Sequence, residues 1–200
     1  MNTYLPLWTF IVLMIVTPGP GNLLIMTLGS QHGFWKSIPF NCGLITGNLL
    51  LNVSIVCGFG VIVDRFPNAS TVFAYLSGIY MIWLVLRGWN FQGHDNEQPR
   101  LLGFVSGLFI HPVSPKAWVM GLLAYSQFVS PDAGVFEAII LVPLSFLIGL
   151  MFFHSFWCLA GCLLKKVIGK SLFLNRILSI VTIGVVLWAV IYGININKGK

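Results

Sequence analysis

Charged residues are scarce in this chain. Asp, Glu, Lys and Arg make up only 8% of its 200 residues, whereas a soluble domain carries about 25%. So few charges cannot cover a water-exposed surface, which argues against a soluble protein. The hydrophobic residues, 57% of the total, gather in long blocks. A block of roughly 18 or more such residues with almost no charge is typical of a membrane-spanning helix.

Acidic residues are the scarcest charged type, and all of them lie at block ends or in loops. Proton-coupled transporters usually carry a carboxylate or a histidine within the membrane. Without a carboxylate there, His111 and His154 are the candidate proton-coupling groups. For His154 we favour a structural role, as a buried histidine bonded to a carbonyl. For His111 we favour a role in transport, because it adjoins one of the two helix breaks described below.

Several other signals are missing. No Walker A motif is present, which argues against ATP drive, and nothing indicates a cofactor. The net charge of +6 comes from basic residues scattered between apolar blocks, so we expect no nucleic-acid partner. The four cysteines lie inside apolar blocks without metal-ligand spacing, and we expect no metal site. The N-terminus lacks a basic region and a cleavage site, so we expect it to be a retained first helix.

The apolar blocks predict an all-α integral membrane protein with six transmembrane helices. They run from about residue 4 to 29, 38 to 63, 71 to 89, 101 to 129, 135 to 164 and 177 to 194. The most polar stretch, 90–100, lies between the third and fourth. We expect one transmembrane domain over residues 1–200, made of two repeats at about 1–89 and 101–196.

The distribution of Lys and Arg predicts the orientation of the helices. Cytoplasmic loops carry an excess of these residues. Seven fall in or beside the loops after helices one, three and five: Lys36, Arg87, Arg100, Lys165, Lys166, Lys170 and Arg176. Three fall on the other side: Arg65, Lys198 and Lys200. The first set is therefore expected in the cytoplasm, and both termini are expected in the periplasm of a bacterial inner membrane.

The first and fourth blocks are each interrupted by two prolines. A shift of 94 positions places Phe10 on Phe104, Pro18 on Pro112 and Met26 on Met120, while Pro20 and Pro115 miss alignment by one position. Proline inside a helix removes a hydrogen bond and clashes with the preceding turn. Because each half has three spans, the two repeats must be inverted. Broken helices at matching places in inverted repeats indicate a transporter's binding site at the bilayer midplane.

The breaks also suggest what the site binds. A half-helix N-terminus attracts a carboxylate, and carbonyls freed before a break can accept from an ammonium group, so a zwitterionic amino acid suits the pair. The expected substrate-binding residues are Thr17, Pro18, Gly19, Pro20, Gly21, Asn22, Asn48, Ser114 and Lys116. Lys116 is the only Lys or Arg deep inside a block. It either contacts the substrate carboxylate, pairs with freed carbonyls, or extends to the membrane surface.

Two patterns of small and polar residues predict helix contacts. Asn41, Asn48 and Asn52 share a helix face, where they either face a cavity or form hydrogen bonds between helices. Gly43–Gly47 and Gly103–Gly107 match the GxxxG pattern and indicate close helix packing.

At these residues the sequence resembles the lysine exporter superfamily, in its homoserine/threonine-resistance branch. Thr17-Pro18-Gly19-Pro20-Gly21-Asn22-Leu23-Leu24 is similar to the family's TPGPxxLL signature, and Ser114-Pro115-Lys116-Ala117 to its NPKA region. Details at 126–131 and 157–161 most resemble members that export cysteine and O-acetylserine. The chain departs from the pattern at Gly21 and Ser114, where the family has Asn, and at Asn48, where many members have an acidic residue.

The resemblance implies a secondary exporter of small neutral amino acids or their derivatives, working by alternating access and driven by the proton gradient. Its partners would be the solute and the lipid bilayer, and a homodimer is left open. A cation or metal-ion exporter of the same superfamily is the alternative. An intramembrane enzyme is a third hypothesis, with Ser114 near His111 as its only candidate pair. We favour the exporter and expect no enzymatic activity.

Overall fold

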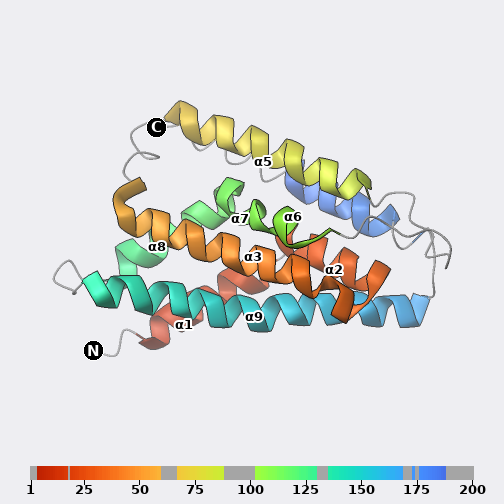
Figure 1. Ribbon diagram of the computed structural model, residues 1–200, viewed down its shortest axis with the longest axis horizontal. Helices are drawn as coiled ribbons and strands as arrows, with labels where there is room; N and C mark the ends of the chain where they lie inside the picture. Colours follow the sequence, from red (N-terminus) through yellow and green to blue (C-terminus); the bar gives the residue numbers. More distant parts are fainter. Residues whose placement is uncertain are drawn as a thin grey trace.

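The computed structural model describes residues 4–17, 19–59, 67–87, 102–129, 135–168, 173 and 176–187. Within these ranges the regular structure is entirely helical (Figure 1). The helices are α1 (Tyr4–Val16), α2 (Pro20–His32), α3 (Phe34–Ser54), η1 (Ile55–Phe59), α5 (Pro67–Arg87), α6 (Phe104–Leu108), α7 (Ile110–Val113), α8 (Pro115–Phe128) and α9 (Val135–Ile168). A further apolar helix spans Arg176–Leu187.

The first apolar block is split into α1 and α2, at the place where the sequence predicts a break. The two helices meet at an angle of 58°. Gly19 has an extended backbone, with φ −133° and ψ 169°, and Pro20 is the first residue of α2. Proline suits this position because it needs no N–H partner there, and its fixed φ already matches a helix. Pro18, the other proline of this break, lies outside the described residues.

The fourth block is split in the same manner. α7 ends at Val113, Ser114 is extended with φ −80° and ψ 117°, and Pro115 begins α8. A residue that precedes proline is pushed out of the helical region by the proline ring. Ser114 and Gly19 therefore have equivalent places in the two breaks, each one residue before the proline that opens the next helix.

The helices run along a common axis and form one bundle (Figure 1). α3 and α9 lie side by side in opposite directions over most of its length, and α2 packs closely on α9. α5 lies on the other side of α3, beside α6 and α7. Gly33, with φ 84°, forms the tight turn between α2 and α3. This positive φ is readily adopted only by glycine.

Glycines allow two pairs of helices to approach at backbone distance. In α9, Gly161 faces the carbonyl of Met26 in α2, and in α2, Gly29 faces the carbonyl of Cys158 in α9. At each position an added Cβ would overlap the facing backbone oxygen. Such close contacts between small residues are the usual way in which helices associate within a membrane.

The second close pair is α3 with α6, and it involves three of the four glycines in the predicted GxxxG patterns. Gly43 and Gly47 face the carbonyls of Phe104 and Leu108, and Gly107 faces the carbonyl of Phe40. The prediction of close packing is thus confirmed at these three residues. For Gly103 it stays a prediction, because no atom of the described residues lies within 4 Å of where its Cβ would be.

Two of the described helices are long and apolar enough to cross a membrane alone, Phe34–Gly58 and Ile140–Val167. The bent pair Leu5–Val16 and Pro20–His32 makes a third crossing if its two halves form one span. Large apolar side chains also face outward, as in Leu5, Phe152 and Val167, which are 75%, 67% and 83% exposed. An apolar outer surface is suited to lipid. The total of six spans stays a prediction, since 60–66, 88–101 and 188–200 lie outside the described residues.

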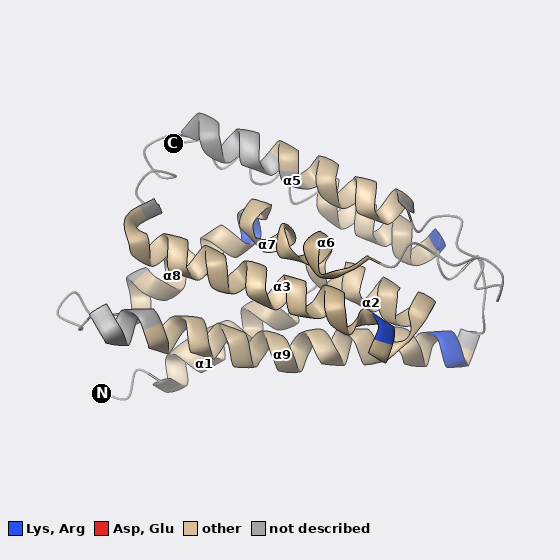
Figure 2. Ribbon diagram, viewed as in Figure 1, with Lys and Arg blue, Asp and Glu red and all other residues tan. Residues whose placement is uncertain are grey.

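Most of the described basic residues gather at one end of the bundle. Figure 2 shows blue segments near the start of α3, at the end of α9 and at the nearby end of the last helix, and one further segment apart from these beside α7. Lys36 is in the first turn of α3, Lys165 and Lys166 are in the last turn of α9, and Arg176 begins the last helix. The isolated basic residue is Lys116, in the first turn of α8.

Candidate functional site

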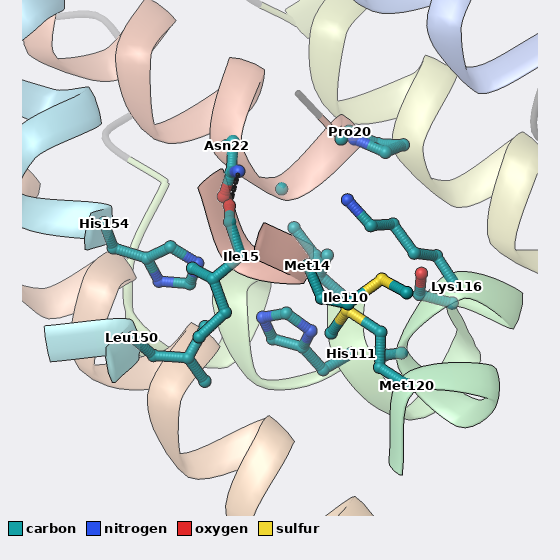
Figure 3. Close-up of a pocket in the computed structure, with 14 residues that line it drawn as sticks. Met14, Ile15, Pro20, Asn22, Ile110, His111, Lys116, Met120, Leu150 and His154 are labelled. Atoms are coloured by element: carbon teal, nitrogen blue, oxygen red, sulfur yellow. Dashed lines mark hydrogen bonds between the residues drawn. The ribbon is translucent and has the colours of Figure 1, made fainter. Parts of the chain in front are cut away.

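The two helix breaks face one another across a chamber in the middle of the bundle (Figure 3). It contains about 390 Å³ of empty space, counting its open mouth. The chamber is lined by Met14, Ile15, Gly19, Pro20, Gly21, Asn22, Ile110, His111, Ser114, Lys116, Ala117, Met120, Leu150 and His154.

Asn22 satisfies backbone groups that the first break exposes. Its side-chain nitrogen donates to the carbonyl of Ile15 at 2.7 Å and to that of Thr17 at 3.2 Å. The Thr17 hydroxyl donates to the carbonyl of Met14 at 2.7 Å. The last carbonyls of a helix have no partner within the helix, and leaving them unpaired in an apolar setting is costly. Asn22 and Thr17 therefore help to hold the end of α1 in place.

Trp118 has the corresponding role at the second break. Its ring N–H donates to the carbonyl of Pro112 at 2.8 Å. The N–H of Ser114 donates to the carbonyl of His111 at 3.0 Å. Each break thus carries its own hydrogen bonds to the carbonyls that it frees.

Lys116 connects the two breaks. Its Nζ donates to the Thr17 carbonyl at 3.0 Å and to the Thr17 hydroxyl at 2.9 Å, across 99 positions of sequence. The ammonium also lies against Gly19, where an added Cβ would be 3.2 Å from Nζ. Of the three alternatives for Lys116, this geometry matches pairing with a freed carbonyl. It also puts the charge at the wall of the chamber, within reach of a bound anion.

Two helix N-termini open at the chamber without a side-chain cap. Gly19, before α2, has no side chain that could cap the helix. Ser114, before α8, forms no capping hydrogen bond with its hydroxyl group. The first N–H groups of a helix carry partial positive charge and are suited to bind a carboxylate. The ends of α2 and α8 therefore add to the positive potential of Lys116.

His111 and His154 form the opposite part of the wall. Their rings are stacked, with centroids 5.7 Å apart and planes at 12°. His111 is 8% exposed and His154 is fully buried. His154 Nδ1 is 3.2 Å from the side-chain oxygen of Asn41 on α3. Among the described residues, both ring nitrogens of His111 and Nε2 of His154 have no hydrogen-bond partner. Buried polar atoms are rarely left unpaired, and these three lie at the wall of the chamber.

The structure does not bring every predicted site residue to the chamber. Asn48 lies in α3 away from the lining, where its side-chain oxygen accepts from Asn52 at 2.8 Å. Thr17 is not part of the lining but holds Lys116. Pro18 lies outside the described residues. Gly19, Pro20, Gly21, Asn22, Ser114, Lys116, His111 and His154 all line the chamber.

The asparagine face of α3 forms hydrogen bonds rather than a cavity wall. Asn41 contacts His154 on α9, and Asn52 donates to Asn48 within α3. The predicted hydrogen bond between helices therefore fits the side chain of Asn41, whereas the side chains of Asn48 and Asn52 bond to each other within α3.

The sequence analysis missed the apolar part of the wall. Six such residues line the chamber: Met14, Ile15, Ile110, Ala117, Met120 and Leu150. An apolar residue in an apolar span looks like a core residue, so no sequence signal distinguishes it. Two of the six are methionines, whose flexible thioethers adapt to ligands of different shape.

Comparison with known proteins identifies the family. The profile of the LysE type translocators matches residues 12–193, which is nearly the whole chain. The protein belongs to the LysE type translocator family. The predicted resemblance is therefore confirmed, and the chain is a transporter rather than an enzyme.

Two relatives of this translocator carry the same name. The cysteine/O-acetylserine efflux protein of Salmonella typhimurium is 27% identical over 163 residues, covering 80% of this chain and 82% of the relative. The protein of that name from Escherichia coli O157:H7 is 26% identical with the same coverage. No solved structure matches the chain significantly.

Proposed function

We propose that this translocator exports small neutral amino acids or their derivatives, of the cysteine/O-acetylserine or threonine/homoserine type, across the bacterial inner membrane. The observation that carries the proposal is the chamber between two broken spans, with an ammonium and two uncapped helix N-termini at one part of its wall. The names of the curated relatives support the same class of solute.

In the proposed site, the substrate carboxylate binds beside Lys116 and the N-terminus of α2. The ammonium of Lys116 already lies against Gly19, so a carboxylate there would gain a charge-assisted hydrogen bond. Lys116 would keep or exchange its bonds to Thr17 as the carboxylate binds. The wall formed by Met14, Met120 and Leu150 is apolar and offers no charge to pair with an acidic or basic substrate side chain.

Alternating access would use the similarity of the two halves. Each half contributes one broken span, and each broken span packs on a long helix of the other half: α2 on α9, and α6 on α3. This exchange is what two inverted repeats related by a pseudo-twofold axis would produce. We propose that the halves rock around the chamber. The end with Lys36, Lys165 and Lys166 would face the cytoplasm and both termini the periplasm.

We propose that the proton gradient drives export and that His111 and His154 carry the proton. They are the titratable groups of the chamber wall besides Lys116 among the residues described. A histidine is the side chain whose charge changes most readily near neutral pH. Among the described residues, no set of three or more His, Cys, Asp or Glu side chains could hold a metal ion.

The test is transport by purified protein in lipid vesicles. Radiolabelled cysteine, O-acetylserine, threonine, homoserine and lysine are screened for movement in a pH gradient, beside a metal-tolerance assay in cells. We expect movement of one or more neutral amino acids, no movement of lysine and no effect on metal tolerance. Transport of metal ions without any neutral amino acid would contradict the proposed function.

A further inference from the structure

At the first break, three of the freed carbonyls already accept hydrogen bonds from the protein's own side chains. The carbonyls of Met14, Ile15 and Thr17 already accept from the Thr17 hydroxyl, from Asn22 and from Lys116. The sequence analysis expected these freed carbonyls to bind the ammonium of an amino acid. In the folded chain, the protein's own side chains occupy them.

Buried ring nitrogens without a partner among the described residues lie on the histidine pair at the chamber wall. His154 Nδ1 is 3.2 Å from Asn41 Oδ1, and with this amide oxygen as the acceptor, neutral His154 carries its proton on Nδ1. Nε2 of His154 is then left with a lone pair and no partner. His111 has no partner at either nitrogen, so one of its two nitrogens is a second free acceptor. Lys116 lies on the other side of the same chamber (Figure 3).

We propose that His154 Nε2 and His111 together form the binding site for the substrate's primary ammonium group, and that a proton and this ammonium compete for the same ring nitrogens. The inference rests on the function proposed above, since it needs a small zwitterion whose carboxylate is at Lys116. In the neutral pair, both lone pairs can accept from the ammonium. A protonated ring loses its acceptor and gains a positive charge, so it expels the ammonium.

Competition of this kind would couple the movement of the solute in one direction to the movement of protons in the other. The chamber holds either the solute or the proton, so each crossing of one is followed by the return of the other. The two imidazole rings are nearly parallel, with their centroids 5.7 Å apart. A positive charge on one ring therefore disfavours a positive charge on the other. One proton for the pair is therefore the expected loading.

Few other groups can affect this equilibrium among the described residues. Lys116 on α8 is the charged group that faces the pair across the chamber. From α1 and α2 the lining residues are Met14, Ile15 and residues 19–22, none of which titrates, and α3 contributes the neutral Asn41. Cys158, one turn beyond His154 on α9, packs on Gly29 outside the lining. Changes in the protonation of Lys116 and of the histidine pair therefore account for the expected pH dependence of substrate binding.

The experiment measures the Kd of L-cysteine for the purified full-length protein between about pH 5.5 and pH 7.5, where the charge of the ligand hardly changes. The matched probe is 3-mercaptopropionate, which keeps the thiol and the carboxylate but lacks the ammonium. We expect the affinity for cysteine to fall as the pH falls, with a slope that approaches tenfold per pH unit only below the pKa of the ligand-free pair. The affinity for 3-mercaptopropionate should change far less.

Three variants locate the effect. His154→Gln keeps an acceptor that does not titrate, and His111→Gln does the same at the other ring, so each should flatten the pH dependence for cysteine. Asn41→Asp puts a carboxylate on Nδ1 of His154, which favours the protonated ring, so the loss of affinity should begin at higher pH. Ser155→Ala, at an exposed hydroxyl bonded within α9, is the control and should leave the profile unchanged.

The possible results distinguish the proposed competition at the histidines from the proposed export of neutral amino acids. Equal pH slopes for cysteine and 3-mercaptopropionate, or unchanged slopes in both histidine variants, would overturn the competition while leaving neutral amino-acid export intact. If the protein bound no cysteine at any pH and the vesicles moved no neutral amino acid, both proposals would fall together.

Discussion

Lys116 shows how one side chain can hold a structure together and still face a ligand. Its ammonium bonds both oxygens of Thr17 and thereby joins the two broken spans. A charge within the membrane is costly, by at least about 2.5 kcal/mol on insertion scales, and usually marks function. The bonds to Thr17 offset part of that cost, so the charge persists in the chamber between substrates.

The first prediction concerns this residue. Lys116→Ala should abolish efflux of the neutral amino acid while the protein still inserts and folds, because it removes the positive charge at the proposed carboxylate site. Efflux from vesicles and the elution profile of the purified protein measure the two properties. Lys166→Ala, at an exposed lysine at the end of α9, is the matched control. Normal transport by Lys116→Ala would remove this residue from the mechanism.

A second prediction tests the hydrogen bonds at the end of α1. Asn22→Ala leaves the carbonyl of Ile15 without its side-chain donor in a buried place, so it should lower the free energy of unfolding by roughly 1–3 kcal/mol. Thr9→Ala removes an exposed bond to Leu5 and should have little effect. Thermal unfolding in detergent compares them. Equal stability of the two variants would show that Asn22 does not support the break.

At the level of the helices, the two breaks were predictable and their contacts were not. Pro20 and Pro115 each open a new helix, because proline is unfavourable in a helix interior and favourable at its first turn. Nothing in the sequence indicates that Lys116 meets Thr17, 99 positions away. That contact depends on how α8 lies against α1, which the packing of whole helices decides.

A third prediction concerns the glycine contacts. Gly161→Ala and Gly43→Ala each put a methyl group on a facing backbone carbonyl, which must move, so each should lower stability by about 1–3 kcal/mol or more. Gly184→Ala, in the last described helix, meets nothing within 4 Å and should be neutral or slightly stabilising. Thermal unfolding checks all three. Wild-type stability of Gly161→Ala would contradict the backbone approach of α2 and α9.

At the level of the whole molecule, composition predicted the class and the helices, since a chain with 8% charged residues has too little polar surface for water. It could not predict which polar residues face the chamber. Asn48 and Asn22 look equally suited in the sequence, yet Asn48 pairs with Asn52 and Asn22 lines the chamber. The difference lies in helix rotation, which depends on contacts such as those of Gly43 and Gly161.

A fourth prediction tests the orientation. In a variant without the four native cysteines, Lys36→Cys and Val167→Cys should resist a membrane-impermeant maleimide added to the periplasmic side. Leu5→Cys, near the opposite end of the bundle, should react with it. This follows from the gathering of basic residues at one end. Labelling of Lys36→Cys but not Leu5→Cys would reverse the proposed direction.

The central claim is that a small neutral amino acid binds between the two breaks, and an experimental structure determined with the exported amino acid tests it most directly. We expect the solute in the chamber, with its carboxylate at Lys116 and the start of α2 and its ammonium at His111 and His154. Unbroken first and fourth spans, or a solute bound away from this chamber, would contradict the account.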